Sequence, residues 1–266
     1  MTLVDDPLSK TPSRPSVTGK GRPIIFVHGN ASTREVWTDV VRHLKDAHCC
    51  ITYDLRGHGD GRPSDDTISL DQLVEDLEEV RATIGHERVA LVGHSLGAFI
   101  VARYAERHPG RVEWISLMAM PAGRTENDKK TAADLLQKMK KIGVAQTMPV
   151  LSSSWYTESF TASRPGTLEK RLNQVLAIDE AVFLRFYGLY SRVDVDASLP
   201  HIAVPALIIT GEHARGCGAE VAANVAGLMR DASTVVFADM KNGILTEIPG
   251  KVAQSLHEFA SGIRKN

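Results

Sequence analysis

A serine between two glycines is the clearest chemical feature of this sequence. In ALVGHSLGAF (90–99), Ser95 lies between Gly93 and Gly97, after a run of small apolar residues and before a helical pattern. The G-x-S-x-G pattern is typical of a tight strand-to-helix turn that exposes a nucleophilic hydroxyl. The dipole of the following helix favours negative charge at this point. Ser95 is therefore the candidate catalytic nucleophile.

The segment HGNASTREVW (28–37) offers a second part of a carbonyl-binding site. Gly29 permits a close approach of the backbone, and the amide of Asn30 is expected to pair with that of Leu96. Two such N–H donors form an oxyanion hole, which stabilises the charge that develops on a carbonyl oxygen. The glycine-rich segment DLRGHGDGRPS (54–64) is interpreted as a structural loop that shapes the floor of the site.

These residues need a scaffold, and the pattern of the chain from Pro23 onward predicts one. Short apolar runs alternate with amphipathic helical segments, as in parallel strands joined by crossover helices. The runs are apolar throughout, which is typical of strands covered on both faces. We expect an α/β fold with a mostly parallel, doubly wound sheet. The predicted strands are 24–28, 49–54, 88–93, 114–119, 206–211 and 234–238.

The strand pattern stops over residues 123–199, where only helical stripes remain. We interpret this segment as an inserted helical cap, because insertions at the carboxyl edge lie where ligand sites of α/β folds form. Extra packing helices without a role in binding are the alternative. The α/β core then comprises 23–122 and 200–266, and residues 1–22, rich in Pro, Ser and Gly, are expected to form a flexible arm.

Three residues of the predicted cap, Trp155, Tyr156 and Arg164, are candidates to face the substrate pocket. The aromatic residues could equally serve in packing among the cap helices.

Composition restricts the partners. The formal net charge is −1, without the concentrated basic face that nucleic acid or an anionic membrane requires. No stretch approaches the length of a membrane span, and residues 1–22 lack the apolar region of a secretory signal, so a cytoplasmic location is expected. Cys49, Cys50 and Cys217 offer neither a disulfide framework nor zinc-ligand spacing. We expect no metal and no cofactor.

The order of the motifs HG-x, D-x-R-G-x-G and G-H-S-x-G resembles that of α/β-hydrolase-fold proteins, from about Pro23 to the C-terminus. This resemblance implies a sheet of the eight-stranded type, although the usual N-terminal hairpin is shortened or missing. Within that superfamily, SSSWYTESF (152–160) together with HGNASTREVW (28–37) resembles the 3-oxoadipate enol-lactonase type and related small-ester hydrolases. The implied substrate is a small ester, lactone or related carbonyl compound.

The resemblance also implies where the partners of the serine belong, and there the sequence departs from the family. The triad acid is expected in T-G-x-x-D after the penultimate strand, and this position is Ala214 in TGEHARGCG. The histidine is expected five residues before Glu247 of EIP, and this position is Asn242. Neither side chain can accept the serine proton near neutral pH. The alternative acid site, after the strand before the cap, reads Ala119-Met120-Pro121 and holds no carboxylate.

Three accounts of the missing partners are open. In the first, another base reaches Ser95, with His213 as the nearest candidate in sequence. His94 and His28 are expected to pack beside their motifs instead. In the second, the site performs non-hydrolytic carbonyl chemistry, as a lyase, decarboxylase, isomerase or cyclase. In the third, the fold only binds a ligand, or the chain is a deliberately inactivated variant. Asp239 and Glu212 have no better claim than any exposed carboxylate.

The function we favour from the sequence is an enzyme of this superfamily acting on a small carbonyl substrate. Ser95 acts beneath the cap, the amides of Asn30 and Leu96 form the oxyanion hole, and the triad positions Ala214 and Asn242 are vacant.

Overall fold

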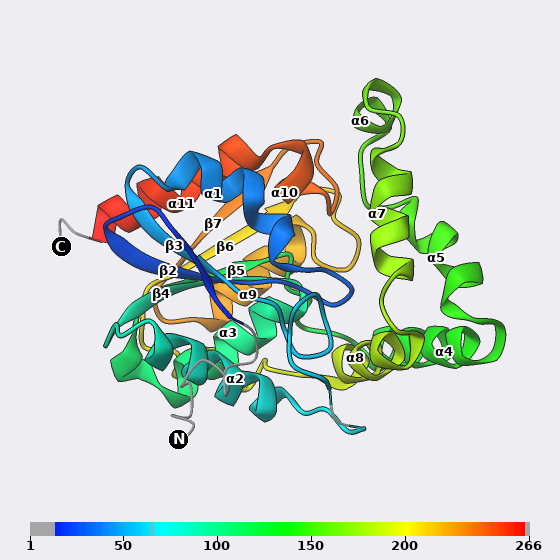
Figure 1. The fold of residues 1–266 in the computed structure, drawn as a ribbon, viewed down its shortest axis with the longest axis horizontal. Coiled ribbons are helices and arrows are strands. Elements are labelled where there is room, and N and C mark those ends of the chain that lie inside the picture. Colours follow the sequence, from blue (N-terminus) through cyan, green and yellow to red (C-terminus); the bar gives the residue numbers. More distant parts are fainter. Residues whose placement is uncertain (1–13, 65, 264–266) are drawn as a thin grey trace, which may run out of the picture.

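A seven-stranded sheet forms the centre of the computed structural model, which describes residues 14–64 and 66–263 (Figure 1). The strand order is β1-β3-β2-β4-β5-β6-β7, and every neighbouring pair is parallel except β1 with β3. The strands are β1 (Ser16–Thr18), β2 (Arg22–Val27), β3 (His48–Thr52), β4 (Val89–His94), β5 (Val112–Met118), β6 (Ala206–Gly211) and β7 (Ala232–Phe237).

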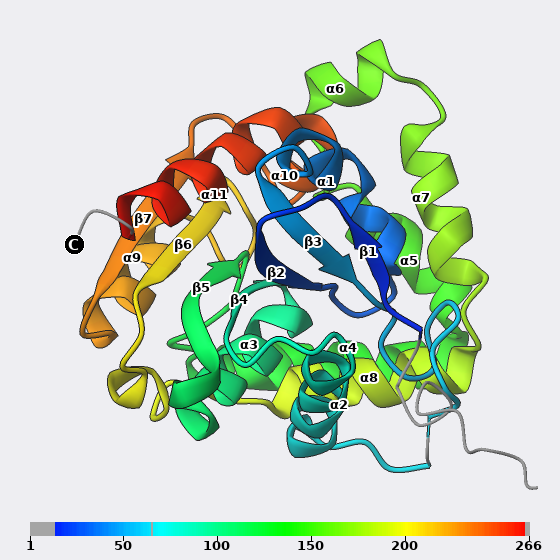
Figure 2. The same cartoon turned by 60° about the vertical axis from the view of Figure 1, so that its left-hand side comes forward.

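Helices cover both faces of this sheet, so the expected doubly wound α/β fold is confirmed (Figure 2). One face packs against α1 (Thr38–Leu44), α10 (Ile244–Glu247) and α11 (Pro249–Ile263). The other packs against α2 (Leu70–Thr83), α3 (Leu96–Arg107) and α9 (Ala219–Leu228). Short 3-10 helices complete the core: η2 (Arg34–Trp37), η3 (Pro109–Arg111) and η4 (Leu199–His201).

Strand β2 shows why the apolar runs of the sequence become central strands. Its side chains alternate between the faces: Ile24 and Phe26 join the core under α1 and α11, while Ile25 and Val27 join the core under α2 and α3. All four are at most 1% exposed. A strand buried on both sides has no polar face to display, which explains its continuous apolar sequence.

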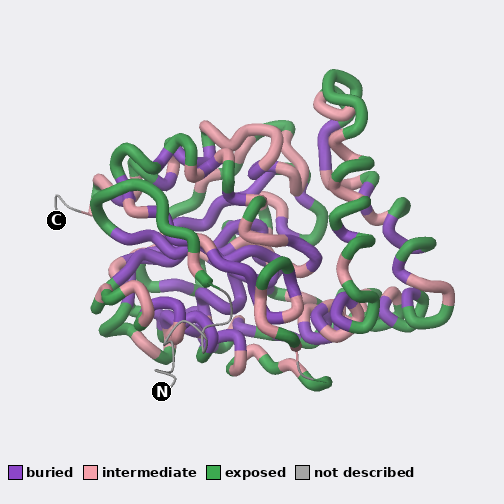
Figure 3. Tube along the Cα trace, in the orientation of Figure 1, coloured by how far each residue is buried: buried purple, intermediate pink, exposed green. Residues whose placement is uncertain are grey.

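The five α-helices between β5 and β6 form one insertion beside the sheet (Figure 1). They are α4 (Glu126–Ile142), α5 (Val144–Ser152), α6 (Glu158–Ser163), α7 (Thr167–Leu176) and α8 (Glu180–Arg192). Met139, Met148, Val175 and Phe183 form a small apolar core of this insertion, which also includes Ala31 of the α/β core. Figure 3 shows the contrast in burial between the sheet and the more exposed insertion helices. In the sequence, Leu176 belongs to a helical stripe with Leu168, Leu172 and Val175, which predicts burial, but in the structure Leu176 is 42% exposed.

The six strands predicted from the sequence all form, with ends shifted by at most a few residues. Strand β1 was not predicted, and it falls within residues 1–22, which we expected to be a flexible arm. Its backbone pairs antiparallel with β3, so the arm prediction is wrong for this stretch. Residues 1–13 of the predicted arm lie outside the described residues. None of the helices in the described ranges is long and apolar enough to cross a bilayer.

Candidate active site

Ser95 occupies the sharp turn between β4 and α3. Its backbone has φ 55° and ψ −117°, a strained conformation for a residue with a side chain. A Cβ atom at Gly93 would lie 2.3 Å from the carbonyl oxygen of Gly97, and one at Gly97 would lie 2.1 Å from that of Val27. Both glycines are therefore required by close backbone contacts, and the turn has the geometry that the G-x-S-x-G pattern predicts.

The loop after β2 lies directly against this turn. A Cβ atom at Gly29 would lie 3.0 Å from the Cβ of Ser95 and 3.5 Å from its Oγ. The N–H of Asn30, in the same loop, donates no hydrogen bond within the described residues, and neither does the N–H of Leu96 at the first position of α3. The N–H of Leu96 has no intrahelical acceptor because it belongs to the first turn of α3. With the N–H of Asn30 also unbonded within the described residues, both donors are available to a ligand.

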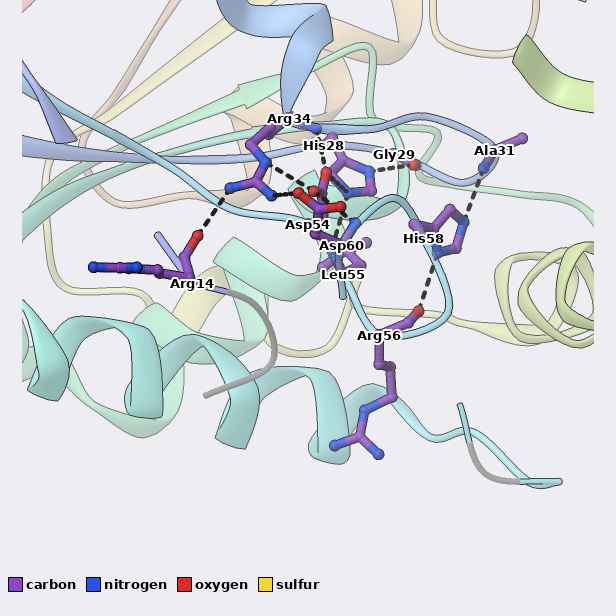
Figure 4. A network of polar contacts seen from close by, with 10 residues as sticks. All are labelled: Arg14, His28, Gly29, Ala31, Arg34, Asp54, Leu55, Arg56, His58 and Asp60. Carbon is purple, nitrogen blue, oxygen red and sulfur yellow. Dashed lines mark hydrogen bonds and ion pairs between the residues drawn. The ribbon is translucent and has the colours of Figure 1, made fainter. Parts of the chain in front are cut away.

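Two buried histidines fix the backbone of this loop by hydrogen bonds (Figure 4). The Nδ1–H of His28 donates to the carbonyl of Gly29 at 2.8 Å, and its Nε2 accepts the N–H of Leu55 at 2.9 Å. His58 accepts the N–H of Ala31 through Nε2 at 3.2 Å. Burial lowers the pKa of His28 to about 3 and also lowers that of His58. Both rings are neutral near pH 7, and both nitrogens of His28 are occupied, so His28 packs as expected and serves no proton transfer at Ser95.

The D-x-R-G-x-G segment supports the same loop. Asp54 is buried and accepts the N–H of Arg34 at 2.6 Å, while the Nε of Arg34 pairs with its other oxygen at 2.8 Å (Figure 4). Gly59 has φ 47°, and a Cβ atom there would lie 2.6 Å from the Asp54 carboxylate. Arg56 pairs with the buried Asp76 on α2 at 2.6 Å. These contacts support the interpretation of residues 54–64 as a structural loop.

A cavity of about 680 Å³ opens beside Ser95, between the α/β core and the helical insertion. This volume suits a small organic ligand. The sequence candidates Asn30, Ser95 and Asn242 line it from the core, and Trp155 and Tyr156 line it from the insertion. Arg164, the third candidate of the insertion, does not line this cavity, so that prediction is wrong. Its guanidinium lies over the ring of Phe160 instead.

Hydrogen bonds join the loops after β6 and β7, in which the resemblance places the triad acid and histidine. Asn242 accepts the N–H of Arg215 at 3.1 Å through Oδ1, and its Nδ2 donates to the Sγ of Cys217 at 3.5 Å. Ala214 is 4% exposed and packs with Ala119 and Cys217 in a small apolar cluster. Burial raises the pKa of Cys217 to about 12, so this thiol is neutral and no base.

Within the part of the chain that the structure describes, no imidazole is hydrogen-bonded to Ser95, and its Oγ has no hydrogen-bond partner. His213, the substitute base considered from the sequence, is exposed and lies outside the cavity lining, with its Nε2 3.9 Å from Glu212. His94 does line the cavity, packed edge-on against Trp37, and burial followed by the charge of Arg171 lowers its pKa to about 4.

Arg171 is a cavity residue that the sequence reasoning missed. It lies on α7, and its guanidinium carbon lies 5.4 Å from the centre of the Trp155 ring. Arg171 lies three residues after Leu168 and four before Val175, so helical periodicity places it on the same face as these apolar residues. A charged residue on an apolar helix face is the feature of the sequence that could have indicated this site.

Comparison with known proteins identifies the family to which this fold belongs. The family model described as alpha/beta hydrolase fold matches residues 22–239. Non-heme chloroperoxidase CPO-A1 of Kitasatospora aureofaciens is 28% identical over 205 residues, covering 73% of this chain and 74% of that protein. Monoacylglycerol lipase abhd6-B of Xenopus laevis is 24% identical, covering 93% and 79%. Among solved structures, the enol-lactonase from Burkholderia xenovorans LB400 has a TM-score of 0.85 at 20% identity, covering 93% and 95%, a likeness of fold.

Proposed function

Because the chain belongs to the alpha/beta hydrolase fold family, we propose that it acts on a small ester, lactone or related carbonyl compound at Ser95. The similarity to proteins named as a monoacylglycerol lipase and an enol-lactonase supports this substrate class. The helices α4–α8 act as the cap over the site, since Trp155 and Tyr156 of this insertion line the same cavity as Ser95.

The observation that carries the proposal is the contact between Gly29 and Ser95. Asn30 follows Gly29 in the chain and Leu96 follows Ser95, and the N–H groups of Asn30 and Leu96 have no acceptor among the described residues, which supports their role as the two donors. A substrate carbonyl oxygen that accepts both bonds has its developing negative charge stabilised in a site partly shielded from water. In this mechanism the Ser95 hydroxyl faces the carbonyl carbon.

Proton transfer is the weak step of this mechanism. Asn242 cannot take the serine proton, and the cluster around Ala214 holds no carboxylate. Loss of these partners typically removes about four to six orders of magnitude of rate, while the oxyanion hole and binding still contribute. Hydrolysis through Ser95 is therefore slow compared with an enzyme that has a complete triad.

Non-hydrolytic carbonyl chemistry is the second candidate, and the state of Asn242 favours it. The oxygen and the nitrogen of its carboxamide both form hydrogen bonds with the loop after β6, so the Asn242 side chain has a structural role in joining the two loops. A lyase, isomerase or cyclase needs only the polarised carbonyl and stabilisation of an enolate, both of which the two amides can supply.

The test combines two measurements on wild type and Ser95→Ala. Turnover of activated esters and small lactones is followed with both proteins, and wild type is treated with a fluorophosphonate probe. Turnover that depends on Ser95, with labelling of Ser95, supports hydrolysis; turnover that depends on Ser95 without labelling supports the non-hydrolytic reaction. Equal turnover in Ser95→Ala rules out a role for the hydroxyl.

A further inference from the structure

The Arg171 guanidinium has no carboxylate partner among the described residues. Its side chain is half-buried at the cavity, and within the described residues it forms no ion pair and no hydrogen bond. The guanidinium stacks on Trp155, with its carbon 5.4 Å from the centre of the indole ring. Burial lowers the pKa of Arg171, which is the mark of a charge that the surrounding protein does not compensate.

Arg171 lines the same cavity as His94 and Ser95. After burial, its charge is among the causes that lower the pKa of His28 and His94, which flank the oxyanion loop and Ser95. The field of Arg171 therefore reaches the place where a substrate carbonyl would bind. One small molecule can contact both the guanidinium and Ser95, because both line a single cavity of about 680 Å³.

The other charges of the cavity leave Arg171 unpaired. Arg124 also lines it, but its guanidinium donates to the backbone carbonyls of Tyr190 and Val193 at the end of α8. Among the described residues that line the cavity, the carboxylate is that of Asp128. It accepts hydrogen bonds from the N–H and the hydroxyl of Thr125, the N-cap residue of α4. With Arg215 at the exposed rim, the lining has an excess of positive charge.

A packing role alone does not account for this arrangement. Removing a guanidinium from water has a large cost, and a stacking contact with one indole ring returns only part of it. A planar carboxylate can accept two parallel N–H bonds from the same group, which is the strongest pairing available to arginine.

We propose that Arg171, stacked on Trp155, binds a carboxylate carried by the substrate, so that the substrate is an anionic ester, lactone or related carbonyl compound. This inference rests on the proposed function, in which the carbonyl of the same molecule lies at Ser95. The Arg171 pair fixes the distant end of the substrate, and the two amides of the oxyanion loop receive its carbonyl oxygen.

The experiment compares pairs of probes that differ only in this charge. The monomethyl esters of succinate, glutarate and adipate are each compared with their dimethyl esters, by calorimetric binding to Ser95→Ala protein near neutral pH. The three chain lengths allow for the span between Arg171 and Ser95. The same pairs are then measured on proteins that also carry Arg171→Gln or Arg171→Lys, with Arg164→Gln as the control. Arg164 is matched because it stacks on Phe160 in the same insertion but does not line the cavity.

We expect at least one monoester to bind about tenfold or more tightly than its diester. Arg171→Gln should remove this preference, Arg171→Lys should keep part of it, and Arg164→Gln should leave it unchanged. Equal binding of monoester and diester at all three lengths overturns the proposal, and so does a preference that survives in Arg171→Gln. The comparison of probes needs no Arg171 variant, so equal binding of monoester and diester overturns the proposal even where Arg171→Gln fails to fold.

The outcomes separate this inference from the proposed function. Turnover of neutral esters that depends on Ser95, without any preference for the monoester, refutes the carboxylate site and keeps the proposed function. A strong preference for the monoester without turnover of any ester or lactone keeps the anion site and refutes the proposed reaction.

Discussion

Asn242 accepts the backbone N–H of Arg215 at 3.1 Å, which ties the loop after β7 to the loop after β6. These are the loops in which the resemblance to the family places the triad histidine and acid, at Asn242 and Ala214. Neither of these side chains can transfer a proton near neutral pH. Restoring the two side chains tests how much of the machinery survives.

The double variant Ala214→Asp, Asn242→His should gain esterase activity toward an activated ester by about a hundredfold or more. A histidine provides the general base for Ser95, and the aspartate orients it and stabilises its charge. Hydrolysis of p-nitrophenyl acetate and labelling by a fluorophosphonate measure the gain. Ala214→Asp alone should lose about 1–3 kcal/mol in the free energy of unfolding, because its carboxylate is buried without a partner. A folded double variant with unchanged activity would show that the two loops are wrongly assigned.

The sequence predicted the parts of this molecule that depend on local pattern. The central strands were found because burial on both faces leaves no polar residue in them, and the turn at Ser95 because glycine spacing is a local requirement. Strand β1 was missed since SVT is short and exposed, without an apolar run. Leu176 belongs to a helical stripe but is exposed, because packing of the insertion is decided by distant segments.

The site was harder to predict than the fold. Ser95 and Asn30 are found from motifs, and both line the cavity. Arg171 is separated from Ser95 by 76 residues of chain, and only the folded insertion brings it to the cavity. Arg164 lies in the segment that the sequence predicts to face the pocket, but membership of a segment does not determine the direction in which a side chain points.

Gly97→Ala should strongly destabilise the protein. The added methyl group would lie 2.1 Å from the carbonyl oxygen of Val27, a rigid backbone atom at the end of β2. We expect a loss of about 3 kcal/mol or more in the free energy of unfolding, measured by urea denaturation. Gly110→Ala is the matched control, since nothing lies within 4 Å of a Cβ there. A difference of less than about 1 kcal/mol between the two variants would contradict the packing described at the turn.

Stability should fall as the pH drops below about 6.5, in part because of His28. Its pKa is about 3 in the folded protein and 6.5 in the unfolded chain, so only the unfolded state takes up this proton between these values. Because of this difference, the free energy of unfolding decreases progressively as the pH falls from about 6.5 to about 3. Between about pH 6.5 and 5 the loss is about 2 kcal/mol.

Urea denaturation of His28→Gln at several pH values isolates this contribution. Glutamine can keep both a donor for Gly29 and an acceptor for Leu55, but it does not titrate. The pH dependence between about 6.5 and 5 should therefore be shallower in His28→Gln than in wild type. His201→Gln, which changes an exposed histidine, should keep the wild-type slope. Equal slopes in all three proteins would exclude a neutral, buried His28.

Glu247 should hold the insertion against the α/β core. Its carboxylate accepts the N–H of Thr157 at 3.1 Å and the hydroxyl at 2.5 Å, directly beside Tyr156 of the cavity lining. Hydrogen bonds to a charged acceptor contribute about 1.5–3 kcal/mol, so Glu247→Ala should accelerate hydrogen exchange of the 154–160 segment. Lys241→Ala is the control: it removes a neighbouring ion pair with Glu158, whose side chain is 88% exposed. An exposed pair contributes about 1 kcal/mol at most, so exchange in Lys241→Ala should stay near that of wild type. If Glu247→Ala exchanges no faster than Lys241→Ala, the insertion is held by its apolar contacts alone.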